Sequence, residues 1–150
     1  MSSQDEVLEY LVRTLEETDT GISLTLSVNG LIISGQMISS KRYFDELANF
    51  YNEKNIATED PSLIEIGLPA LQRIRQFLQE KGKSREGQYN TKFIHLREVM
   101  MYPSDLEYPF PTSLWRGKLS SIDGFSIGRY TLNYDDEEED KQGDYLHDSD

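Results

Sequence analysis

The chain contains no cysteine, no long hydrophobic run and little basic charge. Without cysteine it forms neither disulfide bonds nor thiolate metal sites, which fits a reducing compartment. No apolar stretch approaches the ~20 residues that a membrane-spanning helix needs, and no basic and apolar signal sequence opens the chain. We therefore expect a soluble, cytoplasmic protein that has no membrane partner.

Basic residues are outnumbered, because 15 lysines and arginines stand against 27 acidic residues and the net charge is −12. Residues 135–150 carry −8 of this charge, which leaves −4 for residues 1–134. A run of like charges repels itself and buries no core. We expect one folded domain over residues 1–134 and a disordered acidic tail over residues 135–150. A chain without a basic stripe is also a poor nucleic-acid binder.

Residues that carry catalytic chemistry are sparse. Of the two histidines, His95 lies in a strand-like segment, where a structural histidine with a hydrogen-bond partner is favoured over a general base or a ligand. The sequence lacks nucleophile-elbow, phosphate-loop and dinucleotide motifs, so we expect neither enzymatic activity nor a cofactor. A Ser-His-Asp arrangement assembled in space is the catalytic alternative. The acidic run 135–140 lacks calcium-loop spacing and predicts loosely held cations rather than a metal site.

Residues 22–38 read as a β-hairpin around the turn signal Asn29-Gly30. Pairing outward from the turn places one apolar set on a single face: Ile22, Leu24, Leu26, Val28, Leu31, Ile33 and Met37. The opposite face is mostly polar and is expected to be wet. Gly35 stands opposite Leu24, where the missing side chain leaves room for a close approach or a strong bend.

Residues 113–130 carry a second turn signal, Asp123-Gly124, and predict a second hairpin. Its expected pairs are Ile122 with Phe125, Ser120 with Ile127, Leu119 with Gly128, Gly117 with Tyr130, and Trp115 with Leu132. Both faces contain apolar groups, so the core face stays open, and the glycines let aromatic rings lie across the ribbon. The segment ahead of it, residues 92–102, is rich in β-branched and aromatic residues and predicts a further strand.

Two helical patterns lie in the first third of the chain. Ser3 and Glu6 form a capping box for a helix that ends near Glu17. Ser39 or Ser40 caps a second helix. Its apolar positions are Tyr43, Phe44, Leu47, Phe50 and Tyr51.

A third helical pattern opens at Asp60-Pro61, and its regular part begins near Leu68; residues 81–90 follow as a loop. The order of helix, hairpin, two helices, strand and hairpin predicts an α+β fold. We expect a small Sm-like or SH3-like antiparallel β-barrel, or a strongly bent sheet, with an N-terminal helix and an inserted helical pair. A flat α+β sandwich is the alternative.

Trp115 and Arg116 are the residue types most enriched at binding hot spots, and the favoured alternative is a core tryptophan beside a surface arginine. Phe125, next to the second turn, is either an exposed anchor or a lid over the barrel end. We take these three residues and the acidic run as candidate partner contacts. The acidic residues are Asp135, Asp136, Glu137, Glu138, Glu139 and Asp140.

Three ordered segments resemble the GvpU family of gas vesicle accessory proteins. They are residues 26–39 (LSVNGLIISGQMIS), 93–97 (FIHLR) and 115–128 (WRGKLSSIDGFSIG), and the pair Tyr43-Phe44 also fits. The resemblance implies a non-catalytic accessory role in gas vesicles, the protein-walled shells that give cells buoyancy, with vesicle clustering as the associated activity. It implies as partners the vesicle shell or other gas vesicle proteins, and we expect a homo-oligomer.

Two other interpretations stay open. A small barrel also suits an Sm-like oligomer that binds RNA or a ligand, although the acidic balance argues against RNA. The two later helices also suit a chaperone that holds the apolar shell subunit in a groove. The hypothesis that the resemblance favours is an adaptor, whose folded domain contacts the vesicle shell or another copy of itself. Repulsion between acidic tails would then oppose self-association, so clustering should rise with salt.

Overall fold

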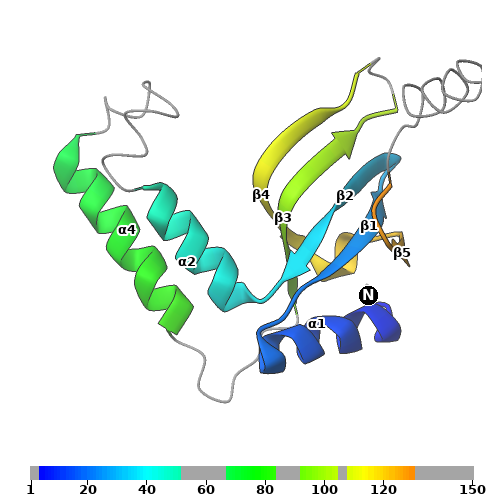
Figure 1. The fold of residues 1–150 in the computed structure, drawn as a ribbon, viewed down its shortest axis with the longest axis horizontal. Coiled ribbons are helices and arrows are strands. Elements are labelled where there is room, and N and C mark those ends of the chain that lie inside the picture. Colours follow the sequence, from blue (N-terminus) through cyan, green and yellow to red (C-terminus); the bar gives the residue numbers. More distant parts are fainter. Residues whose placement is uncertain (1–3, 52–66, 84–91, 105–107, 131–150) are drawn as a thin grey trace, which may run out of the picture.

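One curved antiparallel sheet with helices on two sides makes up the fold (Figure 1). The computed structural model describes residues 4–51, 67–83, 92–104 and 108–130. The helices are α1 Glu6–Thr18, α2 Ser40–Phe50 and α4 Leu68–Lys83; the strands are β1 Ile22–Val28, β2 Leu31–Ile38, β3 Phe93–Tyr102, β4 Phe110–Lys118 and β5 Gly124–Ile127. A short 3₁₀ turn, η2 Leu119–Ser121, joins β4 to β5. The predicted α+β class is confirmed.

The strand order is β4-β3-β2-β1-β5, so β4 and β5 form the two edges of the sheet. Within the described residues no ladder pairs these edges, and the sheet is open. Its strands curve rather than lie flat (Figure 1). The Sm-like or SH3-like barrel is therefore not confirmed.

The first hairpin has the register that its turn predicted. Val28 pairs with Leu31, and Leu24 pairs with Gly35. Both Asn29 (φ 52°) and Gly30 (φ 84°) have positive φ, as a two-residue hairpin turn of type I′ requires. Four side chains of the predicted apolar face are fully buried or nearly so: Leu24, Leu26, Ile33 and Met37. The other three, Ile22, Val28 and Leu31, are partly buried against the core.

The opposite face of this hairpin is less wet than expected. Ser34 is fully buried, because the chain that follows β5 crosses over it. The Tyr130 N–H donates to Ser34 Oγ at 2.7 Å, and Thr25 Oγ1 donates to the Gly128 carbonyl at 2.8 Å. The polar face of the first hairpin thus binds residues 128–130, which lie about a hundred residues later in the sequence.

The second predicted hairpin is wrong. β5 does not pair with β4 but with β1 at the far edge, where Phe125 lies opposite Leu26. Leu119 leaves the strand, enters the core at 1% exposure and donates its N–H to the Lys92 carbonyl. Asp123 makes no turn of its own: its carboxylate accepts the Asn29 N–H at 2.6 Å and so supports the first hairpin's turn. Tertiary contacts override the local turn signal here.

β3 bulges opposite Gly35, where a close approach or a strong bend was predicted. A Cβ at Gly35 would lie 3.0 Å from the Arg97 carbonyl oxygen, so β3 approaches β2 closely at this point. The register shifts between Ser34 and Gln36, and Glu98 on β3 takes a φ of 50°. Such a bulge bends the strand and redirects its side chains.

The hydrophobic core lies between the sheet and α1. It contains Leu8, Val12, Leu15, Leu24, Leu26, Ile33, Met37, Ile94, Leu96, Val99 and Leu119. The cap of α1 is not Ser3 as predicted but Asp5, whose carboxylate accepts the N–H groups of Val7 and Leu8. A cap at Asp5 starts the helix at Glu6, so that Leu8, Val12 and Leu15 share the face turned to the sheet.

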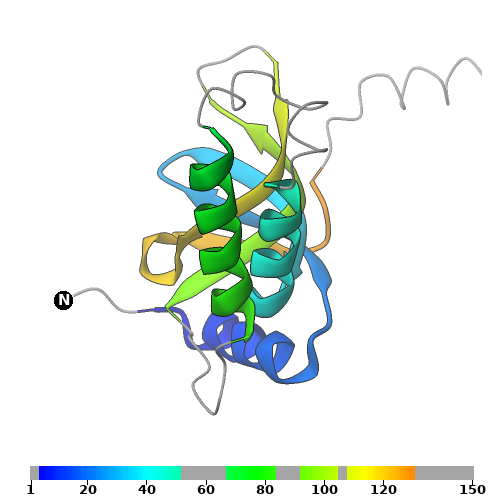
Figure 2. The same ribbon diagram turned by 90° about the vertical axis from the view of Figure 1, so that its left-hand side faces the viewer.

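The helices α2 and α4 pack side by side (Figure 2), and α2 in turn lies against β3. Ser39 caps α2, one of the two expected caps, and α4 begins at Leu68 as predicted. The predicted loop start at residue 81 is too early, because α4 continues to Lys83. Lys81 and Lys83 lie in its last turn, where positive charge stabilises a helix C-terminus. The predicted opening at Asp60-Pro61 and the acidic tail lie outside the described residues.

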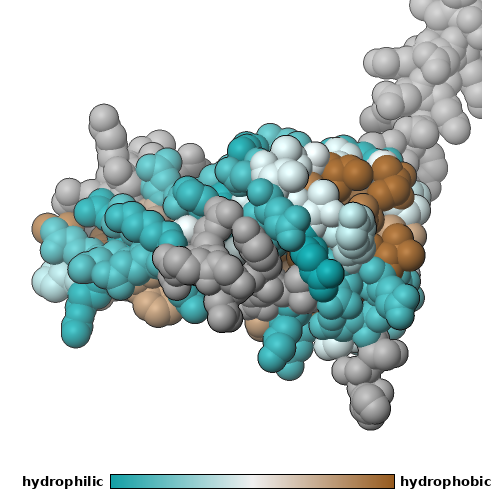
Figure 3. Space-filling view, turned by 90° about the horizontal axis from the view of Figure 1, so that it is seen from below, coloured by the Kyte–Doolittle hydropathy of each residue, from teal (hydrophilic) through white to brown (hydrophobic). Residues whose placement is uncertain are grey.

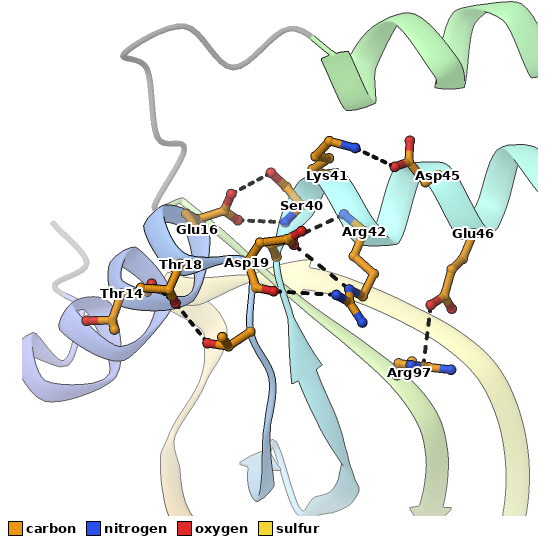
Figure 4. A network of polar contacts seen from close by, with 12 residues as sticks. Thr14, Glu16, Thr18, Asp19, Ser40, Lys41, Arg42, Asp45, Glu46 and Arg97 are labelled. Atoms are coloured by element: carbon orange, nitrogen blue, oxygen red, sulfur yellow. Dashed lines mark hydrogen bonds and ion pairs between the residues drawn. The ribbon is translucent and has the colours of Figure 1, made fainter.

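A polar network ties the end of α1 to the start of α2 (Figure 4). Glu16 is buried, and its two carboxylate oxygens accept the N–H and the hydroxyl of Ser40, each at 2.8 Å. The Ser39 hydroxyl donates to Asp19 Oδ1 at 2.6 Å. Because these bonds satisfy the first donors of α2, they fix where the helical pair departs from the sheet.

Candidate interaction surface

Trp115 and Phe125 lie on the core side of the sheet but at its opposite edges. Trp115 on β4 pairs with Leu96, Phe125 on β5 pairs with Leu26, and both are partly buried against the core. The indole lies across Gly117: a Cβ there would fall 2.8 Å from Trp115 Cζ2. Ring packing over a glycine was predicted, although the hairpin that was to provide it does not form.

Arg116 faces the other side of the sheet, toward α2. Its Nε donates to His95 Nε2 at 3.0 Å. The guanidinium carbon lies 3.9 Å from the centroid of the Phe93 ring and 5.5 Å from that of Phe44. Stacking on an aromatic face and a directed hydrogen bond together hold the long side chain in one conformation.

His95 is a buried strand histidine with a hydrogen-bond partner, as favoured from the sequence. It is 2% exposed, and the ring of Tyr43 lies 4.7 Å away between centroids. Burial first, and the positive charge of Arg116 second, lower the pKa of His95 from 6.5 to about 3. Since Nε2 accepts from Arg116, the proton of the neutral ring is assigned to Nδ1. A ring this weakly basic is poorly suited to be a general base near neutral pH.

A groove of about 560 Å³ lies between α2 and the strands β3 and β4. Its lining residues are Glu46, Phe50, Arg97, Glu98, Val99, Met100, Pro111, Thr112, Ser113, Leu114 and Arg129. The apolar members form most of its surface, and the charged members come from α2, from β3 and from the segment after β5. Apolar walls with a few placed polar groups are typical of binding sites.

The charges of the groove are paired across it. Arg97 Nε lies 3.5 Å from Glu46 Oε2, which joins β3 to α2 (Figure 4). Glu98 lies 3.8 Å from Arg97 and 3.6 Å from Arg129. Two arginines and two glutamates balance each other, so the groove selects by shape and by apolar contact more than by net charge.

Sequence reasoning did not find this groove. Its residues come from segments far apart in the chain, and what brings Glu98 to the rim is the bulge opposite Gly35. Gly35 was the one sequence signal for this region. It indicated a bend in the sheet but not which side chains the bend would expose. The candidate contacts do not form one site, because Trp115 and Phe125 occupy opposite edges and Arg116 the other face. The acidic candidates, residues 135–140, lie outside the described residues.

A second surface feature is apolar. Viewed from below, hydrophobic surface gathers at the end of the molecule that holds α1 and β5, away from the helical pair (Figure 3). Val7 on α1 and Ile127 on β5 are 61% and 59% exposed. In the described ranges no helix is long and apolar enough to cross a membrane, and those ranges hold no group of three or more acidic or histidine residues arranged for a metal.

These features define a small α+β protein with an antiparallel sheet and an apolar groove that has paired charges. The chain belongs to the gas vesicle protein GvpU-like family, whose model matches residues 5–130. The resemblance seen in the sequence is thereby confirmed, and the protein is a gas vesicle-associated protein. Comparison with curated proteins gave no match.

Proposed function

We propose that this protein is a non-catalytic cytoplasmic adaptor that promotes the clustering or assembly of gas vesicles, and so serves buoyancy. It contacts the vesicle shell or another gas vesicle protein, and it associates with further copies of itself. Family membership supports the link to gas vesicles. The observation that carries the adaptor role is the groove between α2 and β3–β4, with its apolar walls and paired charges.

The groove suits a short extended peptide. Its volume of about 560 Å³ falls within the range of roughly 300–1,000 Å³ that is common for ligand sites. Phe50, Met100 and Leu114 supply apolar surface, which contributes roughly 25 cal/mol for each Å² removed from water on binding. The arginine–glutamate pairs at the rim have hydrogen-bonding capacity for peptide groups, which carry no net charge.

Flotation tests this proposal. Purified protein is mixed with intact gas vesicles, and the buoyant layer is assayed for bound protein and for vesicle clusters. Leu114→Glu places a charge in the groove wall, and we expect bound protein to fall at least tenfold. Phe77→Glu is the matched control, because Phe77 on α4 is 58% exposed and outside the groove; it should float like the parent. Equal flotation of the two variants would exclude the groove as the contact.

The same assay separates the adaptor from a chaperone. A chaperone would raise the soluble yield of the shell subunit on co-expression and leave finished vesicles unbound, whereas an adaptor binds finished vesicles. If the parent protein stays wholly below the buoyant layer while subunit yield rises, the adaptor proposal is wrong.

A further inference from the structure

Arg116 presents a fixed guanidinium at the surface of β4. The residue is exposed, yet its Nε is engaged with His95 and its plane rests near Phe93. Over the described ranges no carboxylate lies within ion-pairing distance of it, and no hydrogen bond engages its terminal amino groups. An arginine that is already ordered loses little entropy on binding, and its remaining N–H donors match a carboxylate.

Lys118 adds a second cation on the same strand. It is exposed and lies two residues from Arg116, hence on the same face and roughly 7 Å farther along. Two neighbouring cations favour a run of carboxylates over a single one. Residues 135–140 are such a run, six consecutive acidic residues in a chain whose net charge is −12.

We propose that Arg116 is the docking site for the acidic run of its own chain, residues 135–140. The starting point is fixed, because the Tyr130 N–H is bonded to Ser34 on β2. Ser34 lies four residues from Ile38, and Ile38, His95 and Arg116 are consecutive partners across β2, β3 and β4. Strand geometry puts Arg116 roughly 16 Å from Ser34.

The connecting residues are long enough for this distance. Five extended residues, 131–135, span about 17 Å, so Asp135 just reaches Arg116 and the following acidic residues reach it with slack. A segment tethered this closely acts at an effective concentration in the millimolar range, which favours docking within one chain over docking between copies.

Paramagnetic relaxation tests the docking without vesicles. Gln142→Cys supplies the single thiol of a cysteine-free chain for a spin label next to the acidic run. At 20 mM NaCl we expect strong broadening of the amide signals of residues 114–118, and its loss at 500 mM NaCl. The broadening should also be lost when residues 135–140 are replaced by Asn and Gln, a change that leaves residues 4–130 untouched. Arg116→Gln should abolish it, whereas the control Arg73→Gln on α4 should retain it.

Two results would overturn the proposal. One is the absence of broadening at low salt, or broadening that survives neutralisation of residues 135–140. The other concerns a mixture in which some copies carry only the spin label and others only the isotope label. If broadening in this mixture equals the broadening seen when each chain carries both labels, the contact belongs to a second copy. The spin-label experiment can give the expected broadening while Leu114→Glu still floats with the vesicles. In that case the docking of residues 135–140 on Arg116 is supported and the groove is excluded as the vesicle contact.

Discussion

Acidification should destabilise this protein through one residue, His95. Its ring is 2% exposed, and burial together with the charge of Arg116 lowers its pKa from 6.5 to about 3. In the unfolded chain the same ring takes up a proton near pH 6.5. The unfolded state therefore binds one more proton than the folded state between pH 6.5 and pH 3, and stability falls as pH falls through this window.

The magnitude follows from the size of the shift. A difference of one bound proton changes the free energy of unfolding by about 1.4 kcal/mol for each pH unit. Between pH 7.5 and pH 4.5 this residue alone should remove about 2–3 kcal/mol, which is a large part of the roughly 5–15 kcal/mol that stabilises a typical domain. Burial raises the pKa of the neighbouring Tyr43, so its hydroxyl stays neutral throughout.

Urea unfolding monitored by the single tryptophan measures this effect, at constant ionic strength and at several pH values between 7.5 and 4.5. His95→Gln keeps an acceptor for Arg116 but does not titrate, so its free energy of unfolding should decline about 2–3 kcal/mol less than that of the parent. His147→Gln removes the other histidine and should retain the parent's decline. Parallel pH profiles for the parent and His95→Gln would refute the buried, neutral histidine.

Three further predictions concern packing, capping and charge. Gly117→Ala should lower the free energy of unfolding by about 1–3 kcal/mol in urea titrations, because its Cβ would overlap the indole; Gly124→Ala, where a Cβ would meet nothing within 4 Å, should be neutral. Glu16→Ala should lower the melting temperature, because it removes two acceptors from the half-buried Ser40, a loss of about 1–3 kcal/mol in all. Glu17→Ala, at an exposed position, should not lower it. Deletion of residues 135–150 should increase turbidity and particle size at low salt, and no difference from the full chain at any salt concentration would contradict the charge mechanism.

The parts of the fold that were predictable are those that local sequence specifies. Asn29-Gly30 fixes the register of the first hairpin, because only residues that accept positive φ suit its turn. Asp123-Gly124 has equal local strength but forms no hairpin. Pairing it locally would have left Leu119 outside the core and Asn29 without the Asp123 carboxylate. A turn signal predicts a hairpin only when the flanking residues have no better partner elsewhere in the chain.

The candidate contact residues show the same limit, because the local sequence does not say which part of the fold each side chain will contact. Trp115 is a candidate by residue type and Phe125 by its place beside the second turn, and both pack against the core, because aromatic residues serve interiors as well as interfaces. Arg116 has a different environment: it is exposed, stacked on Phe93 and bonded to a histidine whose low pKa keeps it an acceptor. A surface arginine ordinarily gains little from an exposed ion pair, because ordering its side chain offsets the attraction. The cluster around His95 has already ordered this one, so Arg116 loses less side-chain freedom than an unrestrained arginine when it binds a carboxylate.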